Sequence, residues 1–238
     1  MRPTQCLLVG VTHELFALPQ PQADVAGAGP AWRTDLDPNA LPPTPQLTDG
    51  QRRVLVACME LFADKGYVAS STRDIAGALG VRSPSLYNHF ASKEAMLSTL
   101  VLIGFEYYSN RILTALLEAG GSPRDQLAAL TREHVLVSCE YVRLVIVIQQ
   151  ELPHLPEDAL AVAMGHRQQA SFLLERILDR GQEQGVFDVA HVRTTITTLG
   201  SMSLSAAMTY PFRPEITAAA LADEFVDLAL RLVGATSS

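Results

Sequence analysis

Cysteine is scarce in this chain of 238 residues, and its three copies, Cys6, Cys58 and Cys139, lie far apart. An odd number of cysteines without a CxxC pair argues against a disulfide framework and against a zinc ribbon, and it suits a reducing compartment. Long apolar runs are missing too, because none reaches the roughly 18 residues that a membrane span needs. We therefore expect no membrane partner.

The sequence also lacks the motifs of the common enzyme classes. It contains no HExxH, no GxSxG, no P-loop and no GxGxxG, and His134 and His166 have no paired metal-ligand spacing. We expect no enzyme activity, no metal and no cofactor. The apolar residues 6–11 end at His13 and Glu14 without a nearby cleavage site, which favours a cytoplasmic protein over a secreted one.

Charge is unevenly distributed along the chain. Hydrophobic residues make up 48% of the sequence and charged residues 18%, and the net charge is -7. Residues 48–98 carry a net +1, so the remainder carries -8. Any contact with nucleic acid must therefore be local, and it is expected within residues 48–98.

The sequence divides into three regions. Residues 1–47 hold eight of the fourteen prolines, a density that prevents regular helices, and they are predicted to form a mostly extended or disordered arm. Thr48 or Asp49 then caps a helix, and residues 48–95 form the first helical domain. Residues 96–238 form a larger helical domain. Since no convincing strand or repeat is visible, the predicted fold class is all-α.

Residues 70–90 contain two short helical patterns. In the first, Ile75, Ala76 and Leu79 lie on one face, and the hydroxyl of Thr72 or Ser71 caps the start. Gly80 suits the left-handed conformation that ends a helix.

The second pattern has Ser83 as its predicted N-cap and Pro84 at the first helical position. It buries Leu86 and Phe90 and leaves polar side chains on its outer face. Together the two patterns predict a helix-turn-helix with a polar recognition helix.

A longer stretch, from about Asp49 to Leu100, resembles the DNA-binding domain of TetR-family transcriptional regulators. The resemblance rests on the segments LFADKGY (61–67), TRDIA (72–76), GV (80–81), LYNHF (86–90) and SKEAML (92–97). It implies a three-helix DNA-binding domain followed by a helical ligand-binding and dimerisation domain. The C-terminal part matches the family only in its helical texture.

The resemblance also places individual residues on DNA. Those implied to contact phosphates are Thr72, Tyr87, His89 and Lys93, and those implied to approach bases are Arg73, Ser83, Pro84, Ser85 and Asn88. Arg82 suits either role. Arg52 and Arg53 are equally compatible with phosphate contact and with solvation. Tyr87 and His89 also allow a second interpretation, as half-buried core residues.

The second half predicts long helices broken at Gly or Pro. One starts at Ser92 and ends near Glu118, and one or two helices cover 123–151. Further helices cover 157–184, 192–210 and 216–233. Apolar and small residues in the last two suggest a homodimeric four-helix bundle, although these faces can instead pack within one subunit. They are Ile196, Leu199, Gly200, Ser203, Ala206, Ala207, Ile216, Ala219, Ala220, Phe225, Leu228 and Leu232.

Polar residues within apolar helical stretches are the candidates for a ligand pocket. With their apolar companions they are Phe105, Tyr108, His134, Val137, Tyr141, Arg143, Ile146, Gln150, His166, Gln169, Phe172, Met202 and Met208. Gln149 and Tyr210 belong to the same group. Arg143 precedes an uncharged run and is expected to hold an anionic head group. The texture around Gln149 is similar to that of regulators that sense acyl-CoA or other lipid metabolites.

The resemblance and the residues together predict a homodimeric, ligand-responsive regulator that binds double-stranded operator DNA, as a repressor released by a small, mostly apolar effector. The helix that starts at Ser92 is expected to carry the ligand's effect from the pocket, near Phe105, to the DNA. Alternatives are an activator or a ligand-independent regulator. A helical interaction protein that does not bind DNA, and a helical enzyme, are less favoured.

Overall fold

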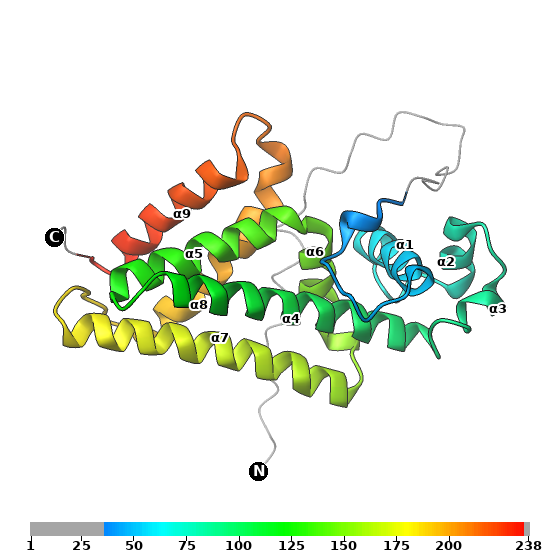
Figure 1. Cartoon of the computed structure of the whole chain (residues 1–238), viewed down its shortest axis with the longest axis horizontal. Coiled ribbons are helices and arrows are strands. Elements are labelled where there is room, and N and C mark those ends of the chain that lie inside the picture. The colour runs from blue at the N-terminus through cyan, green and yellow to red at the C-terminus, as the bar shows by residue number, and fades with distance from the viewer. Residues whose placement is uncertain (1–35, 236–238) are drawn as a thin grey trace, which may run out of the picture. The chain divides into compact units, whose positions relative to one another are not determined.

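Every element in the part of the chain that the structure describes is a helix (Figure 1). The computed structural model describes residues 36–235, and the prediction of an all-α fold is confirmed. The α-helices are α1 (Asp49–Lys65), α2 (Thr72–Leu79), α3 (Ser83–Leu86), α4 (Lys93–Glu118), α5 (Pro123–Glu140), α6 (Val142–Glu151), α7 (Glu157–Glu183), α8 (Val192–Thr209) and α9 (Ala218–Leu232). Short 3-10 helices are η1 (Pro38–Ala40), η2 (Leu152–His154) and η3 (Tyr210–Phe212).

Side-chain hydroxyls determine where several helices begin. Thr48 forms a capping box with Gln51: the Thr48 hydroxyl accepts from the Gln51 N–H at 3.2 Å, and Gln51 Oε1 accepts from the Thr48 N–H at 3.0 Å. Ser92 caps α4 by accepting from the Ala95 N–H at 3.1 Å. Of the two caps predicted for α1, Thr48 rather than Asp49 is used, and the predicted start of α4 is correct.

The C-terminal helices pack around α5, which contacts α4, α7, α8 and α9. Leu127, Leu174 and Leu178 belong to a buried core among these helices. The two long helices α4 and α7 pack along each other (Figure 1). A second core joins α5 to α9 through Val135 and Leu221.

Helix α6 is the element that packs on both α1 and α4. Gly104 of α4 faces it, and a Cβ at this position would come within 2.3 Å of Ile148 Cδ1, so glycine allows α6 to approach α4 closely. At its end, Glu151 accepts a hydrogen bond from the Tyr67 N–H, in the loop after α1, at 3.0 Å. Helix α6 therefore connects α1 to the larger helical part, in addition to the connection that α4 makes.

The structure adds detail at three places in the predicted elements. Of the one or two helices predicted for 123–151, the structure has two, because the backbone at Tyr141 leaves the helical region (φ -123°, ψ 50°). Ser83 is the first residue of α3 and not its cap; Arg82 occupies the cap position, without a side-chain hydrogen bond. Within the predicted arm, residues 36–47 form η1 and an irregular segment in which Leu41, 1% exposed, and Pro42 are buried. Residues 1–35 lie outside the described part.

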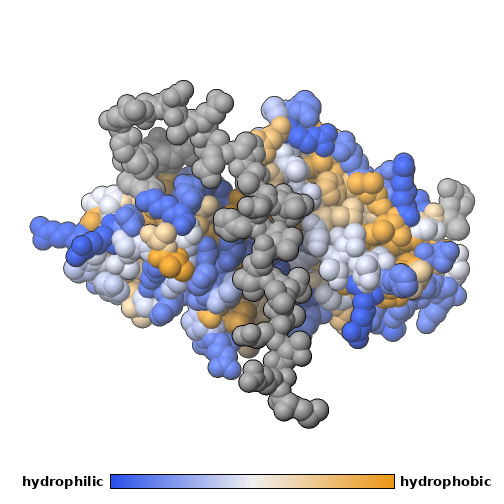
Figure 2. Space-filling model, turned by 180° about the vertical axis from the view of Figure 1, so that it is seen from behind, coloured by the Kyte–Doolittle hydropathy of each residue, from blue (hydrophilic) through white to orange (hydrophobic). Residues whose placement is uncertain are grey.

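The faces predicted to form a dimer seam are only partly available. Leu199, Ala206 and Ala207 are buried within the subunit, whereas Leu228 and Leu232 of α9 are 51% and 42% exposed. The remaining exposed members are Gly200, Ala219 and Ala220, and the side chain of Ser203 lies outside the described part. Figure 2 shows hydrophobic side chains at the surface of the end of the molecule where α8 and α9 lie.

Candidate nucleic-acid interface and pocket

Local contacts fix both ends of α2, the first helix of the helix-turn-helix. Ser71 caps α2, and its hydroxyl and N–H both donate to Asp74 Oδ2, at 2.6 and 2.8 Å. These hydrogen bonds lower the pKa of Asp74 and keep the carboxylate charged beside the positive end of α2. Gly80 ends the helix in the left-handed conformation (φ 67°). The predicted turn is therefore present, with Ser71 rather than Thr72 as the cap.

Two buried side chains orient α3 on α2. Ile75 is fully buried in α2 and Leu86 is 1% exposed in α3, so α3 has one fixed inner face. The residues predicted to contact DNA lie on the remaining surface. Exposed among them are Arg73, Arg82, Pro84, Tyr87, Asn88 and His89, and half-buried are Thr72, Ser83 and Ser85. Tyr87 is 52% exposed, so it is not a core residue.

Lys93 is placed differently from the other residues of this set. Its ammonium donates to the carbonyl oxygens of Tyr67 and Ser70, both at 2.8 Å, and lies 4.0 Å from the centroid of the Tyr67 ring. The ammonium thus holds the loop between α1 and α2 against the start of α4. This role differs from the predicted phosphate contact, because two of its three donors are used inside the domain.

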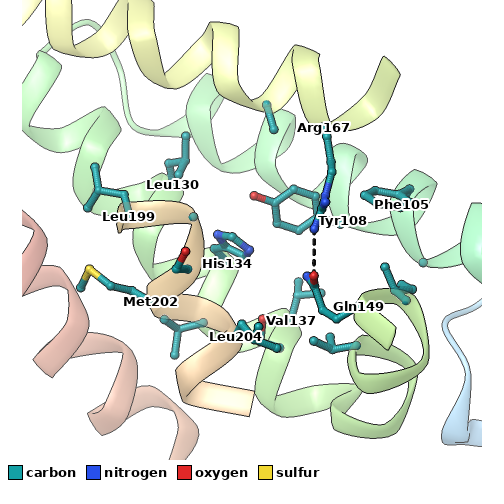
Figure 3. A pocket seen from close by; sticks show the side chains of 18 of the residues that line it. Phe105, Tyr108, Leu130, His134, Val137, Gln149, Arg167, Leu199, Met202 and Leu204 are labelled. Atoms are coloured by element: carbon teal, nitrogen blue, oxygen red, sulfur yellow. Dashed lines mark hydrogen bonds between the residues drawn. The ribbon is translucent and has the colours of Figure 1, made fainter. Parts of the chain in front are cut away.

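A cavity of about 470 Å³ lies among α4, α5, α6, α7 and α8 (Figure 3). Its walls are mostly apolar and include Leu130, Leu144, Ile148, Leu174, Leu199 and Leu204. Polar groups interrupt them, among which are those of Ser138, Gln149, Arg167, Ser171, Thr197 and Ser201. Size, apolar walls and a few polar groups are typical of a small-molecule site.

About half of the residues predicted for a ligand pocket line this cavity. Lining residues among those predicted are Phe105, Tyr108, His134, Val137, Tyr141, His166 and Met202, together with Gln149. Absent from its lining are Arg143, Ile146, Gln150, Gln169, Phe172, Met208 and Tyr210. Gln150, Gln169 and Phe172 are exposed instead. Each neighbours a lining residue on its helix but points to another side of it, because adjacent residues on a helix differ by about 100°.

Arg143 is bound to α1 rather than to a ligand. Its guanidinium pairs with Glu60 at 2.9 Å and with Asp64 at 2.6 Å, and it donates to the Glu60 carbonyl at 2.8 Å. The cation that does line the pocket is Arg167 of α7, which donates to Gln149 Oε1 at 2.8 Å (Figure 3). Sequence reasoning missed Arg167, although it lies one turn before Ala170 and Ser171, which share its face of α7.

The centre of the pocket is polar but uncharged. The ring centroids of His134 and Tyr108 lie 4.6 Å apart, and both residues line the cavity. The imidazole of His134 is surrounded by protein atoms. Burial lowers the pKa of His134 to about 4 and raises the pKa of Tyr108. Both groups are therefore neutral at pH 7. The interior of the pocket therefore offers neutral hydrogen-bonding groups. The permanently charged side chain in the lining is that of Arg167, which lies next to the exposed Gln149.

Two further contacts organise the side of the pocket nearest Phe105. The Ser109 hydroxyl and His166 Nδ1 form a hydrogen bond of 2.9 Å, and the His166 ring stacks on Phe105 with 6.0 Å between ring centroids. Through these contacts, α7 and α4 share one wall of the cavity. Within residues 36–235, no group of three or more His, Cys, Asp or Glu side chains is placed to hold a metal ion. No helix in that range is both long and apolar enough to cross a bilayer.

Comparison with known proteins matches both parts of the chain to one family. Residues 54–100 match the model described as "Bacterial regulatory proteins, tetR family", and residues 120–233 match "Tetracyclin repressor-like, C-terminal domain". The HTH-type transcriptional repressor KstR2 of Mycobacterium tuberculosis is 27% identical over 143 residues, which cover 60% of this chain and 71% of that protein. Its structure, titled as that of a ketosteroid transcriptional regulator, matches with a TM-score of 0.73 and 22% identity over 81% of this chain and 98% of that one.

Two other solved structures are similar. A tetR-family bacterial regulatory protein from Rhodococcus RHA1 has a TM-score of 0.74 and 25% identity, covering 80% of this chain and all of that one. AibR, solved in complex with isovaleryl coenzyme A and operator DNA, has a TM-score of 0.69 and 21% identity, covering 79% of this chain and all of that one. The matched families and relatives are transcriptional regulators and not enzymes, as the sequence predicted.

Proposed function

Because this chain belongs to the tetR family of bacterial regulatory proteins, we propose that it is a transcriptional repressor that a small amphipathic molecule releases from its operator. One observation carries the proposal: helix α4 connects an exposed recognition helix, α3, to an apolar cavity of about 470 Å³. The similarity to the repressor KstR2 supports repression over activation.

The proposed DNA contacts fall into two groups. The hydroxyl of Thr72, the phenol of Tyr87 and the imidazole of His89 are suited to phosphate oxygens, which give affinity without sequence information. The exposed Arg73 and Asn88 are suited to base edges, since arginine pairs with guanine and asparagine with adenine. Ser83, Pro84 and Ser85 would lie close to the bases, and Arg82 suits either role.

The proposed effector has an apolar body and an anionic group. Leucine and isoleucine side chains line the body of the pocket, and the neutral His134 and Tyr108 favour uncharged polar groups there. Arg167 supplies a cation for a carboxylate or phosphate. An acyl-CoA or a lipid-like acid has this character. AibR binds an acyl-CoA, and the KstR2 structure carries the name of a ketosteroid regulator, which supports this class of ligand.

The proposed release is mechanical. Helix α4 runs from Lys93, which holds the loop between α1 and α2, to Phe105 in the pocket wall. In a homodimer formed through α8 and α9, a shift of α4 changes the spacing of the two recognition helices, which must fit half-sites about 34–36 Å apart. The effector must bind the released conformation more tightly for this to occur.

An electrophoretic gel shift with the DNA upstream of the protein's own gene tests the proposal. We expect a specific complex that isovaleryl-CoA or a long-chain acyl-CoA dissociates, with the apparent operator Kd rising at least about 10-fold. Ala170→Trp fills the pocket from α7, so it should keep the complex and lose the response to the ligand. A complex that no amphipathic acid dissociates would favour a ligand-independent regulator. Absence of any specific complex would favour a helical interaction protein.

A further inference from the structure

Pro42 lies in the segment 41–48, immediately before α1, and lines the pocket. Leu41 is 1% exposed, and Pro42 is buried and lines the cavity. The preceding η1 packs on α1 (Figure 1). The family match begins only at residue 54, so this segment lies outside it. A stretch that enters α1 therefore closes one side of a cavity built otherwise from the C-terminal helices.

An arginine of α1 holds this segment in place. Arg52 Nη1 donates to the Pro42 carbonyl at 3.0 Å, and Nη2 donates to the Leu41 carbonyl. The Thr44 hydroxyl donates to the same Pro42 carbonyl at 2.9 Å. Pro42 and Pro43 fix their own φ angles, so the segment has little freedom to absorb a displacement. A push on the Pro42 ring is thus passed to the carbonyls that Arg52 binds.

The other end of the segment reaches the DNA-reading surface. Thr48 caps α1 through Gln51, and the Gln51 side-chain amide donates to the His89 carbonyl at 3.4 Å. A Cβ on Gly50 would come within 2.4 Å of His89 Cε1, so the imidazole lies directly on the first turn of α1. His89 follows α3 and is one of the proposed phosphate contacts. The start of α1 therefore lies between the Pro42 wall and the recognition helix.

We propose that Pro42 is a wall of the effector site and that Arg52 is the positioning residue that passes occupancy of the pocket to α1 and α3. The inference rests on the proposed function, because it assigns a second route from the same pocket. It differs from the α4 route in its residues: the apolar body of the ligand presses on Pro42, and the α1 start moves against His89. Arg52 acts through backbone carbonyls and need not touch the ligand.

Binding of 8-anilinonaphthalene-1-sulfonate, a fluorescent apolar anion, tests the pocket wall. Pro42→Trp projects an indole into the cavity and should raise the Kd of the probe at least 10-fold. Pro43→Trp is the matched control, because Pro43 is the exposed neighbour, and it should leave the Kd within 2-fold. Pro42→Ala and Pro43→Ala repeat the comparison without a bulky side chain, with a change of 2-fold or more expected only at Pro42. Equal effects at the two prolines would overturn the assignment.

The role of Arg52 is tested by a ratio of two operator Kd values. The Kd measured with saturating probe is divided by the Kd measured without the probe. Arg52→Gln should bring this ratio to within 2-fold of one, whereas Arg53→Gln, which removes the same charge from the exposed neighbouring residue, should keep the wild-type ratio. Division cancels any loss of phosphate contact that the two variants share. A wild-type ratio in Arg52→Gln would overturn the proposed route.

The outcomes separate this inference from the proposed function. A wild-type ratio of one, together with loss of probe binding only in Pro42→Trp, would contradict release by this class of ligand and still support Pro42 as a pocket wall. A wild-type ratio well above one that Arg52→Gln retains would support the proposed function and leave α4 as the route. Failure of the wild-type protein to bind the DNA upstream of its own gene would contradict the proposed function alone.

Discussion

Asn88 lies two residues after the last residue of the recognition helix α3, and its side chain is exposed, as is that of the neighbouring Tyr87. An amide that pairs with adenine discriminates bases, and each such bidentate pair contributes about 1–3 kcal/mol. We expect Asn88→Ala to weaken operator binding by about 10-fold and binding to random DNA by less than about 2-fold. Fluorescence anisotropy with both DNAs at one salt concentration measures the difference.

Tyr87→Phe is the matched variant for this experiment. It removes only the phenolic hydroxyl, which is proposed to donate to a phosphate, so it should weaken operator and random DNA by similar factors. If Asn88→Ala instead reduced both affinities equally, Asn88 would be a backbone contact and the base-reading assignment would fail.

The lowered pKa of His134 leads to a prediction about how the free energy of unfolding depends on pH. Its folded pKa of about 4 is below the unfolded value near 6.5. The unfolded chain therefore binds a proton first as the pH falls, and stability that is complete above pH 6.5 is lost between pH 6.5 and 4. From pH 8 to 5.5, wild type should lose about 1.4 kcal/mol of unfolding free energy that His134→Gln does not lose.

Urea unfolding at the two pH values measures this difference between the proteins. Other groups that titrate in the same range contribute to both, so only the difference matters. Parallel pH profiles for wild type and His134→Gln would mean that the imidazole can be protonated in the folded pocket, which would contradict its assignment as a neutral group.

At the scale of elements, two glycines of α7 differ in what surrounds them. At Gly181 a Cβ would come within 1.9 Å of the Phe187 ring, which is only 5% exposed, because the chain after α7 folds back and its Phe187 N–H donates to the Gly181 carbonyl. Gly181→Ala should cost about 1–3 kcal/mol, since a buried ring must move. Thermal or urea unfolding gives the value.

Gly165 provides the control in the same helix. It is exposed, and a Cβ there would meet nothing within 4 Å. Gly165→Ala should therefore stabilise the protein by about 0.5–1 kcal/mol through helix propensity alone. Equal stabilisation by both substitutions would show that the return of Phe187 onto α7 is loose.

At the scale of the whole molecule, the exposed face of α9 is the proposed dimer interface. Leu228 and Leu232 lie one turn apart on α9, and both are exposed, while other members of the predicted seam are used inside the subunit. Leu228→Asp places a charge in the proposed interface, where an unpaired buried charge costs several kcal/mol, so the dimer Kd should rise about 100-fold or more. Sedimentation velocity over a concentration series measures it.

Leu117→Asp is the matched control for the dimer, because Leu117 is 85% exposed and belongs to α4, which is not part of the proposed interface. It should leave the association unchanged. If Leu228→Asp remained as associated as wild type, the exposed face of α9 would not be the interface.

The sequence predicted the elements well, because each has a local signal. The helix starts at Thr48 and Ser92 and the turn at Gly80 depend on neighbouring residues, so a linear reading suffices. Prediction was weaker for α3, where Arg82 rather than Ser83 holds the cap position, since a helix of four residues has little periodic pattern. It was also weaker at Tyr141, where no Gly or Pro marks the break.

The pocket shows where sequence reasoning stops. Helical spacing identifies residues that share a face, but it does not say which face turns toward the cavity. Arg143 and Arg167 are both cations within helical stretches; α1 offers Glu60 and Asp64 to the first, and α6 offers Gln149 to the second. Only the packing of distant helices separates the two roles.

The sequence by itself determined the helical class, the helix-turn-helix and the family, because caps, turns and the recognition motif are made by residues close together in the chain. The tertiary structure alone decided which side chains face the pocket, that Lys93 holds a loop, and that residues 41–48 join the pocket to α1. These depend on contacts between residues far apart in sequence, whose geometry is fixed only when the helices pack.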